Sequence, residues 1–228
     1  MSDIGELSQD IDSDIRQELK ALLEDYPELP DWVAPTRGEP KDPEIVWTGG
    51  APYSSKAYPL IEILAGDFPG KLWAGPLPDR RRLGFLVPQL EALQASGVQR
   101  VVCLIPEMDL LGRYAVPQYP AEARRLFQDN VHFLDVANYS VPTVDIHFDA
   151  AVEAVSTSLA NGEGVLVHCG AGCGRAGMFV GCVLVHGGMS PFKAIRTYRQ
   201  FRTCGPETAF QVAWVVRYAQ RRGIPVDG

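Results

Sequence analysis

The stretch from residue 168 to residue 177 carries the residue types best suited to chemistry. It reads His-Cys-Gly-Ala-Gly-Cys-Gly-Arg-Ala-Gly. Cys169 offers a sulfur nucleophile, and the small residues after it let backbone N–H groups turn inward around an anion. Arg175 adds a planar, permanently charged fork that suits phosphate oxygens. Together these groups predict a site for covalent phosphoryl transfer. The candidate phosphate ligands are Gly170, Ala171, Gly172, Cys173, Gly174 and Arg175.

The flanking elements have the pattern needed to position this stretch. Residues 164–168 form a continuous apolar run, which is typical of a buried strand, and residues 174–186 have helical character. A thiol at the end of such a strand faces the positive end of the following helix, which favours its thiolate form. The sequence therefore places Cys169 where a nucleophile is activated.

Strands and helices alternate along the rest of the chain. The predicted strands are 71–74, 100–105, 131–136 and 164–168. The predicted helices are 13–25, 80–96 with Pro88 as a possible break, 119–129, 145–160, 174–186, 191–202 and 207–221. This alternation predicts an α/β fold with a central, mostly parallel sheet of four or five strands flanked by helices.

Composition excludes several classes of protein. Of the 228 residues, 46% are hydrophobic and 21% are charged, which is the mix of an ordinary globular protein. There is no apolar run of about 18 residues, so no membrane span is predicted. The acidic start lacks the pattern of a targeting peptide, so we expect a cytoplasmic protein. Five cysteines, an odd number, argue against a disulfide scaffold and favour reduced thiols.

Charge divides the chain into two parts. Residues 1–44 hold 13 acidic and 4 basic residues, whereas residues 45–228 hold 15 acidic and 17 basic residues. We interpret residues 1–44 as an acidic, proline-rich extension with one helix, and residues 45–228 as the catalytic domain. The extension is either a solvated leader whose one amphipathic helix packs on the domain, or a docking segment for a protein partner. The slightly basic body leaves room for an anionic ligand but argues against binding nucleic acid.

A run of bases without acids surrounds the cysteine stretch. Between Glu163 and Glu207 there is no acidic residue, while the interval contains Arg175, Lys193, Arg196, Arg199 and Arg202. We expect Lys193 and Arg196 to form a solvated helix face and the last two arginines to lie near the loop.

Other interpretations of the cysteine stretch are weaker. A dinucleotide fingerprint would need a second strand ending in an acid about 20 residues later, where a helix is predicted instead. A metal site formed by the histidine and the two cysteines has no second ligand pair. A purely structural glycine-rich turn also remains open.

Residues 168–175 fit the signature H-C-x-x-G-x-x-R of the cysteine-dependent protein phosphatases. The chain resembles their dual-specificity branch, and within it the cyclin-dependent-kinase-associated phosphatase group. Residues 71–78 look like the family's early strand and turn, and the stretch from Ser190 to Gln211 resembles its closing helices.

The resemblance implies a mechanism in two steps. Cys169 would attack phosphorus and form a cysteinyl-phosphate intermediate, while Arg175 and the N–H groups of residues 170–174 hold the phosphate oxygens. Water would then release phosphate. The resemblance implies a phosphorylated protein as substrate, and neither a metal nor a cofactor.

Two positions depart from the family pattern. Ala176 stands where the family has Ser or Thr, and Asn138 stands where it has the acid that protonates the leaving group. Asp135 is the nearest candidate for that acid, and Asp145 is next. The activity is therefore either a phosphatase or, alternatively, a pseudophosphatase that binds phosphorylated partners. A non-protein phosphate as substrate is a third, weaker alternative, because the loop has no lysine.

Cys173 is a third unusual residue, four positions after Cys169 in the same loop. One hypothesis makes it a resolving thiol that forms a reversible disulfide with Cys169 and so protects the nucleophile from over-oxidation. The alternative is a small residue that fills the loop.

Overall fold

A five-stranded, mostly parallel sheet forms the centre of the computed structural model, which describes residues 7, 11–33, 60–63, 67–80 and 84–226. Its strand order is β1(Ile61–Ile63), β2(Lys71–Gly75), β5(Gly164–His168), β3(Val98–Cys103), β4(Val131–Phe133). Only β1 runs antiparallel to its neighbour, and the other pairs are parallel. The predicted α/β fold is confirmed.

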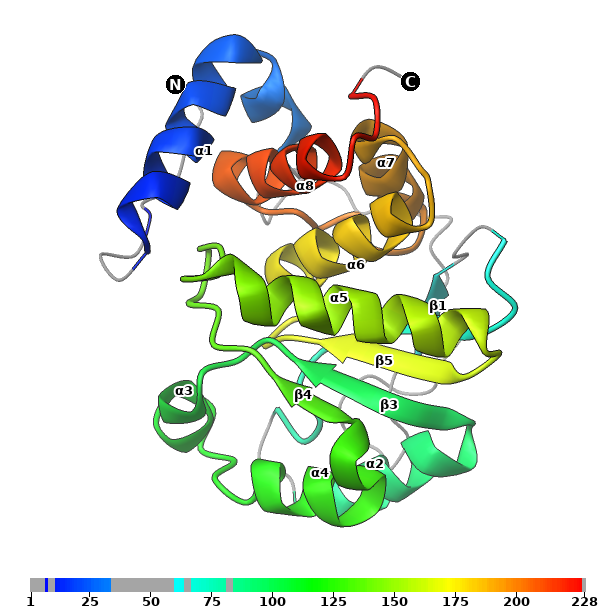
Figure 1. The fold of residues 1–228 in the computed structure, drawn as a ribbon. Helices are drawn as coiled ribbons and strands as arrows, with labels where there is room; N and C mark the ends of the chain where they lie inside the picture. The colour runs from blue at the N-terminus through cyan, green and yellow to red at the C-terminus, as the bar shows by residue number, and fades with distance from the viewer. Residues whose placement is uncertain (1–6, 8–10, 34–59, 64–66, 81–83, 227–228) are drawn as a thin grey trace.

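Helices cover both faces of the sheet (Figure 1). One face carries α5(Asp145–Ala160) and α6(Gly174–His186), with α1(Ser13–Asp25), α7(Pro191–Phe201) and α8(Ala209–Arg221) packed beyond them. The other face carries α2(Leu86–Ala95) and α4(Tyr119–Phe127). A short helix, α3(Glu107–Leu111), follows β3, and two 3-10 turns span Leu29–Trp32 and Gln128–Asn130.

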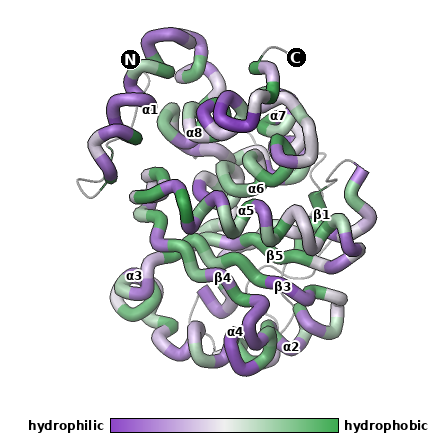
Figure 2. The backbone as a smooth tube through the Cα atoms, in the orientation of Figure 1, coloured by the Kyte–Doolittle hydropathy of each residue, from purple (hydrophilic) through white to green (hydrophobic). Residues whose placement is uncertain are grey.

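The central strand β5 is buried along its whole length, between β2 and β3. The hydropathy colouring of Figure 2 shows the hydrophobic strands running through the middle of the molecule. His168 at the end of β5 pairs with Gly75 on one side and Cys103 on the other. Cys169 therefore leaves the sheet at its carboxyl edge, flanked by the ends of both neighbouring strands.

The predicted elements agree with the structure where the periodicity is long. The bounds of α1, α5, α6 and β5 match their predictions, whereas β4 ends at Phe133 rather than at residue 136. The helix predicted from residue 80 begins at Leu86, and residues 81–83 lie outside the described part. The three-residue β1 and the five-residue α3 were not predicted, because such short elements leave no periodic pattern.

The N-terminal segment 11–33 packs into the same hydrophobic core as the rest. Leu19 and Leu29 are fully buried, and Trp32 stacks on Phe192 of α7 with ring centroids 4.4 Å apart. Asp12 caps α1 by accepting the N–H of Asp14 at 2.8 Å. The described half of the extension is thus a packed helix. The prolines at 35, 40 and 43 and the boundary predicted at residue 44 lie outside the described residues.

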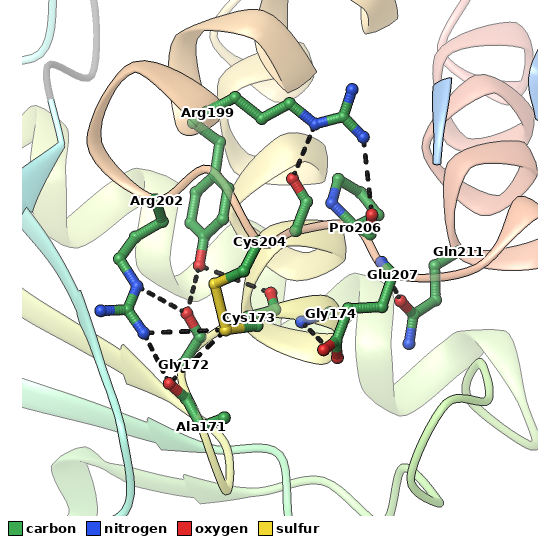
Figure 3. The surroundings of a disulfide bond; sticks show 12 residues. Ala171, Gly172, Cys173, Gly174, Arg199, Arg202, Cys204, Pro206, Glu207 and Gln211 are labelled. Carbon is green, nitrogen blue, oxygen red and sulfur yellow. Dashed lines mark hydrogen bonds between the residues drawn. A yellow bond between two sulfur atoms is a disulfide. The ribbon is translucent and has the colours of Figure 1, made fainter. Parts of the chain in front are cut away.

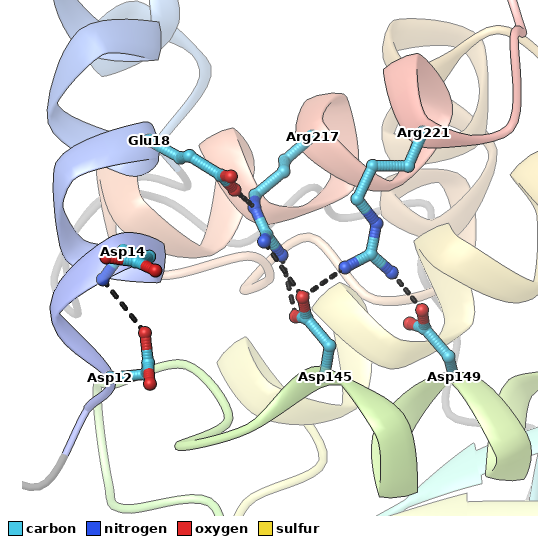
Figure 4. A network of polar contacts seen from close by, with 7 residues as sticks. All are labelled: Asp12, Asp14, Glu18, Asp145, Asp149, Arg217 and Arg221. Atoms are coloured by element: carbon cyan, nitrogen blue, oxygen red, sulfur yellow. Dashed lines mark hydrogen bonds and ion pairs between the residues drawn. The ribbon is translucent and has the colours of Figure 1, made fainter.

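An ion-pair network joins α1, α5 and α8 (Figure 4). The Arg217 guanidinium donates to both carboxylate oxygens of Asp145, at 2.6 and 2.8 Å, and also pairs with Glu18. Arg221 pairs with Asp145 and Asp149. The network holds the N-terminal helix against the helix that closes the fold.

Asp145→Asn should lower the free energy of unfolding by about 2 kcal/mol, because it leaves the buried Arg217 without its bidentate partner. The Arg217 side chain is only 7% exposed, whereas that of Glu18 is 54% exposed. Glu18→Gln is therefore the matched control and should cost about 0.5 kcal/mol or less. Urea unfolding of both variants measures the difference, and equal losses would contradict it.

In the part of the chain that the structure describes, no helix is both long and apolar enough to span a bilayer.

Candidate active site

Cys169 lies at the carboxyl end of β5, 3% exposed, and a tight loop leads from it to the start of α6 at Gly174. Gly172 has φ +68°, a left-handed conformation that favours glycine. A Cβ there would also come within 2.4 Å of the Gly75 carbonyl oxygen at the end of β2. The neighbouring strand therefore packs directly against the loop and requires glycine at this position.

Arg175 is 2% exposed and its guanidinium is held from several sides. Nη1 donates to the carbonyl oxygens of Leu104 and Val136, at 3.1 and 2.8 Å. Nη2 donates to Asn138 Oδ1 at 3.2 Å and to the Tyr114 hydroxyl at 3.3 Å. Two backbone carbonyls thus fix one edge of the fork, while the other edge meets polar side chains.

Tyr114 reaches the loop from the segment between α3 and α4. A Cβ built on Gly170 would lie 1.8 Å from its hydroxyl oxygen, so this hydroxyl sits directly on the loop. Nothing in the sequence singled out Tyr114, because it lies outside every predicted element. The structure adds it to the residues beside Arg175.

Neither of the carboxylates considered for the general acid is among the hydrogen-bond partners of Arg175. Asp135 is exposed and lines a cavity of about 390 Å³, together with Pro106, Glu107, Met108, Leu110, Leu111, Pro117 and Pro120. Asp145 is engaged in the ion pairs with Arg217 and Arg221. Of the residues considered for the position of the acid, Asn138 is the one that bonds to Arg175.

Helix α7 and the residue after it hold the outer side of the loop. The Tyr198 hydroxyl donates to the Gly172 carbonyl at 2.8 Å, and Arg202 donates through Nε to the same oxygen at 2.9 Å. Arg202 also donates to the Ala171 carbonyl. Because the carbonyls face these donors, the loop is fixed from outside by residues that do not occupy its concave side.

The predictions for the basic residues are confirmed for three of the four residues in α7 and directly after it. Arg202 lies on the loop, and Lys193 and Arg196 are exposed. Arg199 instead binds the adjoining segment, donating to the Gly205 carbonyl at 3.1 Å and to the Trp32 carbonyl. Burial lowers the pKa of Arg199 to about 10.

Glu207 is a further polar residue that sequence reasoning missed. Its Oε2 accepts the N–H of Gly174 at 3.0 Å, which is one of the N–H groups predicted to bind phosphate. Gln211 supports it by accepting the Glu207 N–H at 2.9 Å and donating to the Ser140 carbonyl. The only available signal was that Glu207 ends the acid-free interval.

Two buried groups lie beside the nucleophile and stay uncharged. Burial lowers the pKa of His168 to about 3, and its Nε2 shares a hydrogen bond with the Tyr119 hydroxyl. Burial raises the pKa of Cys103 to about 12. The strand ends around Cys169 therefore carry a neutral imidazole and a neutral thiol near pH 7.

Cys173 forms a disulfide with Cys204, 31 residues later, as Figure 3 shows. Cys103, Cys169 and Cys182 are free. The expectation of reduced thiols throughout was therefore wrong for this pair, and so was the hypothesis that Cys173 pairs with Cys169. The reason is topological: α7 ends against the loop, which brings Cys204 next to Cys173, and spacing along the chain cannot reveal that return.

His168 should make folding sensitive to acid. Its folded pKa, about 3, lies below the ordinary 6.5, so the unfolded chain takes up the proton first as the pH falls. The contribution of the neutral His168 to the free energy of unfolding is complete above pH 6.5 and is lost progressively toward pH 3. Between pH 7 and 5 the loss is about 2 kcal/mol. His132 and His186 shift in the same direction.

The measurement is urea unfolding at pH 7 and 5 for the wild type and His168→Gln. The variant should lose less stability than the wild type over this interval, by the amount that His168 contributes. Equal losses in both proteins would show that His168 protonates freely in the folded state.

Part of the chain matches a known protein family. Residues 84–217 match the model described as PTP-SAK: Swiss Army Knife protein, DSP-PTPase phosphatase domain.

Solved structures share the fold at low identity. Kinase associated phosphatase (KAP), with its catalytic-site cysteine replaced by serine, is 20% identical with a TM-score of 0.61, over 73% of this chain and 96% of the other. A human tyrosine phosphatase-like serine/threonine/tyrosine-interacting protein is 24% identical with a TM-score of 0.53, over 74% and 99%. The PTP-2 phosphatase of Cydia pomonella is 15% identical with a TM-score of 0.51, over 69% and 89%.

Proposed function

Since this chain belongs to the family of PTP-SAK phosphatase domains of the DSP-PTPase type, we propose that it dephosphorylates phosphoproteins through a cysteinyl-phosphate intermediate on Cys169. One observation carries the proposal. Cys169 at the end of β5 and Arg175 in the first turn of α6 flank one tight loop, which is fixed from outside by Tyr198 and Arg202. A loop held in this way is preorganised to bind phosphate without rearranging during the reaction.

In the first step the Cys169 thiolate attacks phosphorus and the bond to the leaving oxygen breaks. Arg175 meets the phosphoryl oxygens through its Nη2 edge. Its contacts there, to Tyr114 and Asn138, are single side-chain hydrogen bonds of 3.3 and 3.2 Å that an anion can replace. Its Nη1 edge stays on backbone carbonyls, so the fork keeps its orientation.

Protonation of the leaving oxygen is the weak part of this first step. Asn138 carries no transferable proton, and Asp135 stays a candidate acid from the wall of the neighbouring cavity. General acid catalysis is typically worth about 10²–10⁴-fold. We therefore expect the enzyme to favour substrates whose leaving group departs without a proton, such as activated aryl phosphates.

In the second step water attacks the cysteinyl phosphate and inorganic phosphate leaves. Ala176 offers no hydroxyl to assist the departing Cys169 sulfur. A slow second step would let the intermediate accumulate, so a burst of product should precede steady turnover.

The experiment combines turnover with trapping of the intermediate. Hydrolysis of an activated aryl phosphate and of a phosphotyrosine peptide is followed, and the reaction is quenched in acid to recover phosphate bound to the Cys169 peptide. We expect the aryl phosphate to be hydrolysed faster than the peptide, and the recovered phosphate to be bound to Cys169. Absence of both turnover and phosphate-analogue binding would refute the proposal.

A second function, a phosphate-binding pseudophosphatase, is favoured by the contact between Asn138 and Arg175. An amide in this place can bind the arginine and a phosphate but cannot donate a proton to a leaving group. Binding of tungstate with no turnover of any aryl phosphate would establish this function in place of the first.

Asn138→Asp should weaken anion binding rather than restore an acid. A carboxylate in hydrogen-bond reach of Arg175 would pair with the guanidinium and repel an incoming phosphate. We expect about a tenfold rise in the dissociation constant of tungstate, since each 1.4 kcal/mol is tenfold. Asn138→Ala is the matched control and should bind tungstate about as tightly as the wild type. Faster peptide hydrolysis by Asn138→Asp would contradict the prediction.

A further inference from the structure

We propose that Cys173–Cys204 is a reversible thiol–disulfide exchange site whose oxidised form keeps the phosphate loop in its active shape. The substrate of this exchange is a low-molecular-weight thiol such as glutathione. The consequence for activity rests on the proposed phosphatase function, whereas the exchange itself does not.

The disulfide joins the end of the loop to the segment that follows α7. Cys173 is the last residue before α6, and Cys204 follows α7. Three residues beyond Cys204, Glu207 accepts the Gly174 N–H. The covalent bond and this hydrogen bond together clamp the segment 204–207 to residues 173–174 (Figure 3).

The two cysteine residues of the bond differ in exposure. Cys173 is 8% exposed, whereas Cys204 is half-buried. The Arg202 Nη2 lies 3.8 Å from the Cys173 sulfur. An attacking thiolate therefore reaches Cys204 first, and Cys173 leaves as a thiolate beside a fixed positive charge, which lowers the cost of that step.

The exchange balances with two thiols and no other reagent. The first thiolate bonds to the Cys204 sulfur as the bond to Cys173 breaks, and the electron pair stays on Cys173. A second thiolate then attacks the external sulfur of the mixed disulfide and releases Cys204. The protein gains two electrons, the two small thiols become one small disulfide, and the thiolates take up protons from water. The reverse sequence closes the bond.

The Cys173–Cys204 bond also prevents Cys173 from forming a disulfide with the nucleophile Cys169. With Cys173 bonded to Cys204, Cys169 is free while its neighbour in the loop cannot form a disulfide with it. Of the remaining free thiols, Cys103 has its pKa raised by burial to about 12, so it is a poor thiolate donor. Oxidation of the Cys173–Cys204 pair therefore leaves Cys169 as a free thiol, and activity should be higher in the oxidised protein.

The first arm of the test measures the bond alone. The full chain is equilibrated in glutathione buffers of graded redox ratio, its thiols are blocked, and its peptides are mapped without reduction. We expect a link between residues 173 and 204 that disappears reversibly as the buffer becomes reducing. In Cys173→Ser, oxidised glutathione should modify Cys204, whereas in Cys204→Ser it should modify Cys173 much more slowly. A link from Cys173 to Cys169, or no link, would overturn the proposal.

The second arm measures its consequence. Reduction should lower kcat/KM for an aryl phosphate about tenfold, since a displacement of an ångström at a reacting site can cost about 10²-fold. Cys204→Ser should show the lowered rate in every buffer, and Thr203→Ser, its matched control, should respond to the buffer like the wild type. Thermal unfolding of each variant separates a loosened loop from a loss of folding.

The outcomes separate the two proposals. If the wild type never hydrolyses the substrate, the same buffers are applied to Cys169→Ser with tungstate binding as the readout. A reversible link between residues 173 and 204 with unchanged rate and unchanged tungstate affinity would show that the bond does not shape the loop. The proposed phosphatase function would stand.

Discussion

Cys169→Ser is expected to lose hydrolysis of an activated aryl phosphate by a factor on the order of 10⁴ or more. A serine hydroxyl at this position stays protonated, because the adjacent His168 is a weak base: burial lowers the pKa of its imidazole to about 3, and its Nε2 shares a hydrogen bond with the Tyr119 hydroxyl. The loop N–H groups and Arg175 are unchanged by the substitution. The variant should therefore bind tungstate about as well as the wild type.

Rate and binding must be measured on the same preparation. Steady-state hydrolysis gives the loss, and isothermal titration with tungstate gives the affinity. Cys182→Ser is the matched control, because Cys182 is a free, buried cysteine within α6 and outside the loop. Residual hydrolysis by Cys169→Ser above about a hundredth of the wild-type rate would show that another group is the nucleophile.

Arg175→Lys should reduce kcat/KM for the same substrate by about 10³-fold, because one amine cannot replace a planar fork that meets two phosphoryl oxygens. It should also destabilise the fold by about 2 kcal/mol, since the carbonyls of Leu104 and Val136 would lose their buried donor. The two effects have different origins. The kinetic loss comes from the Nη2 edge and the structural loss from the Nη1 edge.

Arg196→Lys provides the matched comparison. Arg196 is exposed and lies over the Trp32 ring, 4.7 Å from its centroid. Its replacement should change kcat/KM by no more than about twofold, and the free energy of unfolding by no more than about 0.5 kcal/mol. If Arg175→Lys kept the full rate while losing stability, the role of Arg175 would be to stabilise the fold and not to bind phosphate.

The fold was largely predictable because long, periodic segments dominate it. The buried run 164–168 and the helices 13–25, 145–160 and 174–186 have the predicted bounds, since their patterns extend over several turns or a full strand. β1 and α3 could not be predicted, because three and five residues give no period and their positions depend on neighbours distant in sequence.

At the candidate site, local sequence revealed only what the loop itself contains. Cys169, Arg175 and the small residues between them follow from one short stretch. Tyr114 reaches the loop from one distant segment, and Cys204 and Glu207 reach it from another, so no local pattern marks them. The disulfide shows the limit most clearly, because an odd count of cysteines said nothing about which two would meet.

The position of β2 bears on how this protein can be divided. The family match begins at residue 84, after β2 has ended, yet β2 pairs with the strand that carries the nucleophile and Gly75 packs against Gly172. A fragment cut at the limits of that match would leave β5 with an open edge of unpaired N–H and C=O groups, which invites association between chains. The segment by which the family is recognised is therefore smaller than the unit that must fold.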